Sequence, residues 1–339
     1  MMRTEAATNN SGNATGSSRI VPSKAEGIAF CTAFVLVFLF IVVGNLLTIG
    51  LFAVNRSLRK KSLHLVINMA FADLMLGILS LPLYIHAVGY SFGLWKCGWP
   101  ISLNTFYTTV DIFFLQASLI SAAFISGERF YALYWPFKHR TLSTRAYRIV
   151  IFFVWVLTLL ITALFSTTQL SLSFKRFLYY WIPYVLTITF IIYGCNISIW
   201  RKFRGGIIAS QQQARNLRNK RLTKTWLFVS ILALVCWIPF FILNGLIFVY
   251  DFQVPWQFYG LVNLINYSNS FSNPVVYALR ISEFREALVL CCLRRAAAPN
   301  MININRGSKK TPATELRTLR TDNSLLQLNF KQEVLDTKL

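Results

Sequence analysis

Long apolar stretches, separated by short polar segments, make up most of the chain as far as residue 280. Seven of these stretches reach the roughly 20 residues that a helix needs to cross the hydrocarbon core of a bilayer. They cover residues 27–54, 63–89, 99–133, 147–167, 177–200, 224–250 and 256–279. The pattern therefore predicts an all-α membrane protein whose fold is a bundle of seven transmembrane helices.

Two polar ends flank this bundle. After the seventh stretch, residues 283–290 are amphipathic and predict a short helix on the inner membrane face. Cys291 and Cys292 follow as a candidate palmitoylation pair, with two unmodified thiols as the alternative. The sequence thus divides into a tail at 1–26, a membrane domain at 27–292 and a polar tail at 293–339, which we expect to be disordered and cytoplasmic.

The composition also favours a lipid environment. Hydrophobic residues make up 55% of the chain and charged residues 14%, whereas soluble proteins carry about 25% charged residues. The net charge of +22 would be compatible with a nucleic-acid binder. However, the basic residues form short clusters between the apolar stretches and do not form one basic face. We therefore expect lipid, and no nucleic acid, as a partner.

The basic clusters also predict the orientation of the chain, because cytoplasmic loops are rich in Lys and Arg. Only six of the 34 basic residues fall on the side that carries the N-terminus: Arg3, Arg19, Lys24, Lys96, Lys175 and Arg176. We therefore expect a multi-pass protein of the plasma membrane with its N-terminus outside the cell. Asn9 and Asn13 lie in N-x-[ST] sequons of that outer tail and are the candidate glycosylation sites.

Only three acidic residues lie within residues 27–250, all of them in the apolar stretches: Asp73, Asp111 and Glu128. An ionised side chain inside a bilayer costs at least about 2.5–3.5 kcal/mol, so such residues face an interior that holds partners for them. A structural hydrogen-bonding role is the alternative for each. Asp111 and Arg129 are 18 residues apart, so they share one helix face about 27 Å apart. This arrangement fits a cation site outside and a switch for a partner inside.

Asp73 lies in the middle of the second apolar stretch. Ser118, Asn269 and Asn273 would lie near it if the bundle brings the second, third and seventh helices together. Carboxylate, hydroxyl and amide oxygens are ligands that hard cations prefer. These four residues form the candidate site for an allosteric sodium ion, and no other cofactor is expected.

Short motifs occur in order along residues 27–292, about one for each helix. They are Gly44-Asn45, Asn68…Ala72-Asp73, Glu128-Arg129-Phe130, Trp155, Pro183, Cys236-Trp237-Ile238-Pro239 and Asn273-Pro274-Val275-Val276-Tyr277. In these motifs the chain resembles the class A, rhodopsin-like G-protein-coupled receptors. The resemblance implies a receptor that activates a heterotrimeric G protein and is not an enzyme.

The resemblance also implies roles for individual residues. Arg129 would pair with Glu128 at rest and turn towards the G protein on activation, while the sixth helix moves outward. Asn273, Pro274 and Tyr277 would complete this switch. Arrestin and a receptor kinase would bind the C-terminal tail.

The candidate ligand site resembles that of biogenic amine receptors. Asp111 stands where those receptors carry the partner of the ligand's ammonium group, and Tyr267 matches the tyrosine that braces this aspartate. The other candidate ligand-binding residues come from the sixth stretch: Trp237, Phe240, Phe241 and Asn244. A carboxylate beside aromatic faces forms a cation site on physical grounds alone. We therefore expect a small-molecule agonist, an amine.

Other positions depart from the amine receptors. Leu264 replaces a tryptophan of the seventh helix, and Lys175 and Arg176 could repel an amine or bind a ligand's carboxylate. Peptide, melanocortin-like, adenosine-like and lipid ligands therefore remain alternatives.

Cys97 is expected to be a free thiol because the second outer loop contains no cysteine. The inner end of the sixth stretch has no carboxylate to hold Arg129, which predicts raised basal signalling.

Overall fold

The computed structural model describes residues 23–54, 61, 63–171, 174–204, 228, 231–233, 235–247, 254–280 and 284–289. Its elements are α1 (Lys24–Val54), α2 (Leu63–Met75), the π-helical turn η2 (Leu76–Ser80), α3 (Leu81–Ser91), α4 (Ile101–Tyr134), α5 (Pro136–Thr141), α6 (Thr144–Ser171), α7 (Phe174–Arg204) and α9 (Trp256–Arg280). A shorter apolar helix covers Ile231–Ile247. Residues 284–289 are also helical, and no described residue belongs to a β-strand.

Each predicted apolar stretch corresponds to helix in the described part of the chain. Five segments are long and apolar enough to cross a membrane: α1, the continuous segment Leu63–Ser91, α4, and most of α6 and of α7. The sixth stretch contains the helix Ile231–Ile247. The seventh stretch is α9, whose four asparagines share one helix face and are all buried: Asn263, Asn266, Asn269 and Asn273. This helix therefore turns its polar face towards the other helices.

The connections differ from the prediction in two places. We expected the fourth and fifth spans to be joined by residues 167–176, but α6 continues to Ser171 and α7 begins at Phe174, so the connection is shorter. The two ends of the bundle are named after the predicted orientation, inner for the cytoplasmic side and outer for the opposite side. The second inner loop contains the short helix α5, which the sequence did not predict. The helix at 284–289 lies within the predicted amphipathic segment.

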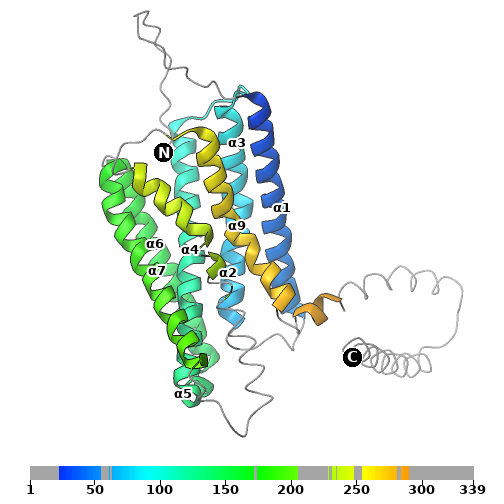
Figure 1. Ribbon diagram of the computed structural model, residues 1–339, viewed down its shortest axis with the longest axis vertical. Helices are drawn as coiled ribbons and strands as arrows, with labels where there is room; N and C mark the ends of the chain where they lie inside the picture. Colours follow the sequence, from blue (N-terminus) through cyan, green and yellow to red (C-terminus); the bar gives the residue numbers. More distant parts are fainter. Residues whose placement is uncertain are drawn as a thin grey trace, which may run out of the picture. The chain divides into compact units, whose positions relative to one another are not determined.

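The helix α4 occupies a central position in the bundle, because it packs against α2, α6 and α7. On one side of the bundle α1 and α9 lie side by side, and α6 and α7 form the opposite side (Figure 1). Large apolar side chains on the outer helices are exposed, for example Leu160 on α6 and Phe190 on α7. This distribution is expected when lipid covers the outer surface.

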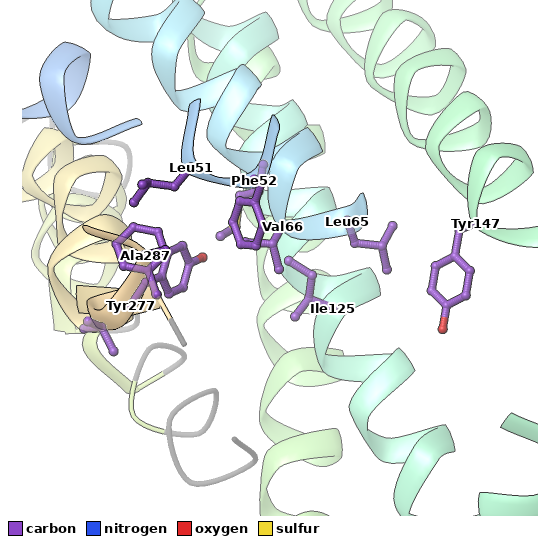
Figure 2. Close-up of a cluster of buried hydrophobic side chains, with 11 residues drawn as sticks. Leu51, Phe52, Leu65, Val66, Ile125, Tyr147, Tyr277 and Ala287 are labelled. Carbon is purple, nitrogen blue, oxygen red and sulfur yellow. The ribbon is translucent and has the colours of Figure 1, made fainter. Parts of the chain in front are cut away.

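A cluster of buried apolar side chains fills the inner half of the bundle. It joins Leu51 and Phe52 of α1 to Leu65 and Val66 of α2, Ile125 of α4, Tyr147 of α6, Tyr277 of α9 and Ala287 (Figure 2). The same cluster includes Phe284, so the helix at 284–289 packs against the bundle. The inner ends of several helices are therefore held by one core.

The π-helical turn η2 interrupts the second span just before Pro82. Pro82 has no backbone N–H to donate to the carbonyl four residues earlier. The Leu81 N–H donates to the carbonyl of Leu76, five residues back, which is the π-helical pattern. The turn changes the register of the helix and ends at Ser80, a fully buried serine.

Candidate functional site

The carboxylate of Asp111 is the centre of a hydrogen-bonded group in the outer half of the bundle. Its Oδ1 accepts a hydrogen bond from the Ser80 hydroxyl at the end of η2. The Tyr267 hydroxyl of α9 donates to the same Oδ1 at 2.7 Å. The Tyr107 hydroxyl lies 3.1 Å from that of Tyr267. Among the described residues no hydrogen bond uses Oδ2 of Asp111.

Three tyrosines from three helices surround this carboxylate. The Tyr84 ring is stacked on that of Tyr107, with centroids 5.9 Å apart, and lies 5.5 Å from that of Tyr267. Tyr84 and Tyr267 are each 2% exposed. The hydroxyl of Tyr84 is buried and has no hydrogen-bond partner within the described residues. The Asp111 carboxylate therefore lies among buried aromatic rings.

The aromatic residues of the sixth span lie beside this group. Trp237 and Phe241 are stacked with centroids 5.4 Å apart, and Trp237 belongs to the same apolar cluster as Tyr267. Trp181 of α7 adds edge contacts to Phe240 at 5.8 Å and to Phe241 at 5.5 Å. Sequence reasoning missed Trp181, because no motif singles out this position.

The structure also describes Asn244, a candidate ligand-binding residue, and Leu264, a position that departs from the amine receptors. The Asn244 amide donates to the carbonyl of Phe240 one turn earlier, at 2.7 Å, so its Nδ2 is used within its own helix. Leu264 packs against the outer apolar cluster, the cluster of buried side chains that contains Trp237 and Tyr267.

The candidate sodium site contains one partner of Asp73 that the sequence did not predict, Ser270. Asp73 is fully buried, and it accepts hydrogen bonds from Ser270 at 2.9 Å and from Asn273 at 3.1 Å. Ser118 also lies near the Asp73 carboxylate. Asn269 donates no hydrogen bond to Asp73, and its Oδ1 has no partner within the described residues. The Asp73 group thus includes Ser270 in addition to the predicted residues, and Asn269 stays a predicted ligand of the ion.

The inner end of α4 carries the Glu128–Arg129 pair. The Nε of Arg129 lies 3.1 Å from Oε2 of Glu128. The other carboxylate oxygen, Oε1, lies 2.6 Å from Nε2 of His139 in α5 and accepts a hydrogen bond at 3.0 Å from the Tyr147 hydroxyl. Sequence reasoning missed His139 and Tyr147. Both of them follow the motif in the chain, and only the path of α5 and α6 brings them back to it.

The remaining switch residues lie at the inner half of α9. Asn273 belongs to the Asp73 group. Pro274 packs so closely on α1 that a Cβ at Gly44 would lie 3.1 Å from the proline ring. The Tyr277 ring lies 6.2 Å from that of Phe284 inside the inner apolar cluster (Figure 2).

Several predictions fall outside the described residues. These are the sequons at Asn9 and Asn13, the thiols of Cys291 and Cys292, the side chains of Lys175 and Arg176, the inner end of the sixth stretch, and the tail at 293–339. Cys97 is described and is an exposed free thiol in the segment before α4. This agrees with the expectation for that cysteine.

Comparison with known proteins identifies the family. The sequence profile described as "7 transmembrane receptor (rhodopsin family)" matches residues 44–277. The adenosine receptor A3 of Ovis aries is 26% identical over 78% of this chain and 89% of its own length. The trace amine-associated receptor 13c of Danio rerio is 25% identical over 78% and 85% of the two chains. The histamine H2 receptor of Homo sapiens is 25% identical over 88% and 87%.

These matches confirm the predicted fold and the resemblance to amine receptors. The profile covers more than half of the chain, and the three relatives are receptors for small molecules by name. The family implies a small-molecule ligand, coupling to a G protein and a multi-pass position in the membrane. The chain belongs to the rhodopsin family of seven-transmembrane receptors and is a G-protein-coupled receptor related to the receptors for biogenic amines.

Proposed function

We propose that the agonist is a small amine whose ammonium group pairs with Asp111. One observation carries this proposal: within the described residues Asp111 has only neutral hydroxyl partners, Ser80 and Tyr267, and no cationic side chain pairs with it. A carboxylate inside a bilayer without a cation is costly. An ammonium ligand supplies the missing charge, and aromatic faces such as Phe241 favour the same ligand.

The relatives support an amine and also suggest one second candidate. Two of them are named for amines, as a trace amine-associated receptor and a histamine receptor. The adenosine receptor A3 favours a nucleoside as the second candidate. A nucleoside without a charge would leave Asp111 without a counter-ion, which is why we prefer the amine.

In this proposal the agonist shifts a two-state equilibrium, because it binds the active state more tightly than the resting state. The resting state keeps Arg129 beside Glu128, as the 3.1 Å distance between them supports. In the active state the sixth helix moves outward and Arg129 turns to the G protein. Asn273, Pro274 and Tyr277 follow this movement from α9.

A sodium ion in the Asp73 group would stabilise the resting state. The buried carboxylate, the hydroxyls of Ser118 and Ser270 and the unpartnered buried Oδ1 of Asn269 are oxygen ligands suitable for a hard cation.

The rest of the proposal concerns the ends of the chain. The receptor resides in the plasma membrane with its N-terminus outside, glycosylated at Asn9 and Asn13. Inside the cell it is palmitoylated at Cys291 and Cys292 and regulated by arrestin and a receptor kinase at its C-terminal tail. The excess of basic residues in the predicted inner loops supports this orientation.

The test is G-protein activation in cells that express the receptor, with a panel of biogenic amines and adenosine. Asp111→Asn should reduce the potency of the active amine by about 100-fold or more, because one partner of a buried charge pair is lost. The matched control is Glu26→Gln, which removes another outer carboxylate, one that accepts a hydrogen bond from Gln257. It should leave the potency within about threefold. An amine response that survives Asp111→Asn, or a response to adenosine alone, would refute the proposal.

A further inference from the structure

The two hydrogen bonds to Asp111 end on the same oxygen. A carboxylate oxygen has two acceptor positions, and at Oδ1 both are taken, one by the Ser80 hydroxyl and one by the Tyr267 hydroxyl. Oδ2 has no hydrogen-bond partner among the described residues. The carboxylate therefore offers a ligand one oxygen and not two.

The donors on Oδ1 are held firmly in place. Ser80 is 0% exposed and stands at the end of the π-helical turn, where the backbone fixes its position. Tyr267 is braced by the Tyr107 hydroxyl at 3.1 Å and by the ring of Tyr84 at 5.5 Å. Turning the carboxylate to free Oδ1 would break both hydrogen bonds at once.

Cationic groups differ in what they require from a carboxylate. A guanidinium is planar and binds best through two parallel N–H bonds, one to each carboxylate oxygen. An ammonium is a compact charge that binds well to a single oxygen. A carboxylate with one oxygen occupied therefore discriminates between these two cations.

We propose that Ser80 and Tyr267 make Asp111 a one-oxygen acceptor, so that the receptor selects ammonium ligands over guanidinium ligands with the same aromatic group. This inference rests on the proposed amine function and adds the chemical class that the site rejects. Ser80 is a positioning residue, because it acts on the ligand through Asp111. Removing its hydroxyl reopens one acceptor position on Oδ1 and lets a guanidinium form its second bond.

The test uses the purified full-length receptor and four matched pairs of probes. Each pair is an arylethylamine and the arylethylguanidine with the same ring, which is phenyl, 4-hydroxyphenyl, imidazolyl or indolyl. Affinity is measured from the ligand-dependent rise in melting temperature. For the pair with the tightest-binding amine, the wild-type receptor should bind the amine at least about tenfold more tightly than the guanidine.

Ser80→Ala should reduce this amine-to-guanidine ratio by at least about threefold, and Ser80→Thr, which keeps the hydroxyl, should restore it. The matched control is Ser126→Ala, a buried serine of α4 whose hydroxyl, within the described residues, bonds only the Ala122 carbonyl of its own helix. It should leave the ratio unchanged. A loss of affinity for both probes by the same factor is the mark of a merely structural role.

Two sets of results would overturn the inference, and they are distinguishable. A wild-type ratio near one, or a ratio that Ser80→Ala leaves unchanged, refutes the one-oxygen acceptor while the amine function stands. If no probe stabilises the wild-type receptor, or if Asp111→Asn weakens none of them, the amine function fails and the inference fails with it.

Discussion

The two carboxylates of α4 have opposite surroundings. Asp111, in the outer half, accepts hydrogen bonds from two neutral hydroxyls, both on one oxygen. Glu128, at the inner end, uses both oxygens: Oε2 faces Arg129 at 3.1 Å, and Oε1 faces His139 and Tyr147 at 2.6 and 3.0 Å. The inner carboxylate is neutralised by the chain itself, and the outer one is not.

This difference indicates a separate role for each end of α4. Burying a carboxylate is costly unless a cation or several hydrogen bonds compensate it. Arg129 provides that compensation for Glu128 without any ligand. Asp111 lacks such a cation among the described residues and gains most from one that arrives from outside. In the proposed function the outer end is thus the ligand site, and the inner end is the lock, the Glu128–Arg129 pair that holds the resting state.

The largest expected effect at the inner end comes from Glu128→Gln. Glutamine keeps the shape of the side chain but removes the charge that holds Arg129, so the active state becomes more populated. We expect ligand-free nucleotide exchange on a purified G protein to rise about tenfold. The matched control is Asp111→Asn, the same carboxylate-to-amide change on the same helix, which should leave basal exchange within about twofold. Equal basal rates for the two variants would contradict the comparison.

A smaller effect is expected between the two ends, at Asp73. Replacing sodium by a large organic cation should raise agonist affinity about fivefold in the wild-type receptor, because in the proposed function sodium favours the resting state. In Asp73→Asn this sensitivity should disappear. Competition binding at constant ionic strength measures both. A variant that responds to sodium as the wild type does would remove Asp73 from the cation site.

Tyr147→Phe tests the neutral part of the inner lock. The change removes one hydroxyl, 3.0 Å from Oε1 of Glu128, and keeps the ring that packs in the inner apolar cluster. We expect basal exchange to rise about threefold, less than for Glu128→Gln, because one hydrogen bond is lost and the ion pair remains. If the hydroxyl does not contribute to the lock, basal exchange will equal that of the wild type.

The smallest effect on signalling is expected at the outer end of α3, where Gly89 packs against Trp95 and no charged group is involved. A Cβ at Gly89 would lie 2.0 Å from the Trp95 indole, so Gly89→Ala must displace this ring and weaken its 3.0 Å hydrogen bond to the His86 carbonyl. We expect a loss of about 1–3 kcal/mol in stability and an unchanged amine affinity. The control is Gly50→Ala, whose Cβ meets nothing within 4 Å. If the two variants melt at the same temperature, the rim is not held by this contact.

Much of the fold could be predicted from the sequence, because the transmembrane stretches are a signal of composition and length. The Asp111–Tyr267 contact could be anticipated from the resemblance, and the 2.7 Å bond between them agrees with it. Ser80 could not be anticipated, because a π-helical turn changes which residues face inward and leaves no periodic signal.

Two more of the residues that sequence reasoning missed, Ser270 and His139, have the same kind of cause. Ser270 is adjacent to Asn269 in α9, and its hydrogen bond to Asp73 depends on the rotation of that helix, which no pattern encodes. His139 lies in α5, a helix of six residues between two spans, too short for a periodic pattern to reveal. Its contact with Glu128 is a tertiary contact that depends on the path of that loop.

The most direct test of this account is the binding of an arylethylamine to three purified receptors: wild type, Asp111→Asn and Glu128→Gln. Both variants change a carboxylate to an amide on α4. We expect Asp111→Asn to weaken binding by about 100-fold or more. Glu128→Gln should not weaken it and should tighten it by up to about tenfold, because this variant populates the active state, which binds the agonist more tightly. Equal losses in the two variants, or a larger loss in Glu128→Gln, would contradict the division of α4 into a receptor end and a lock.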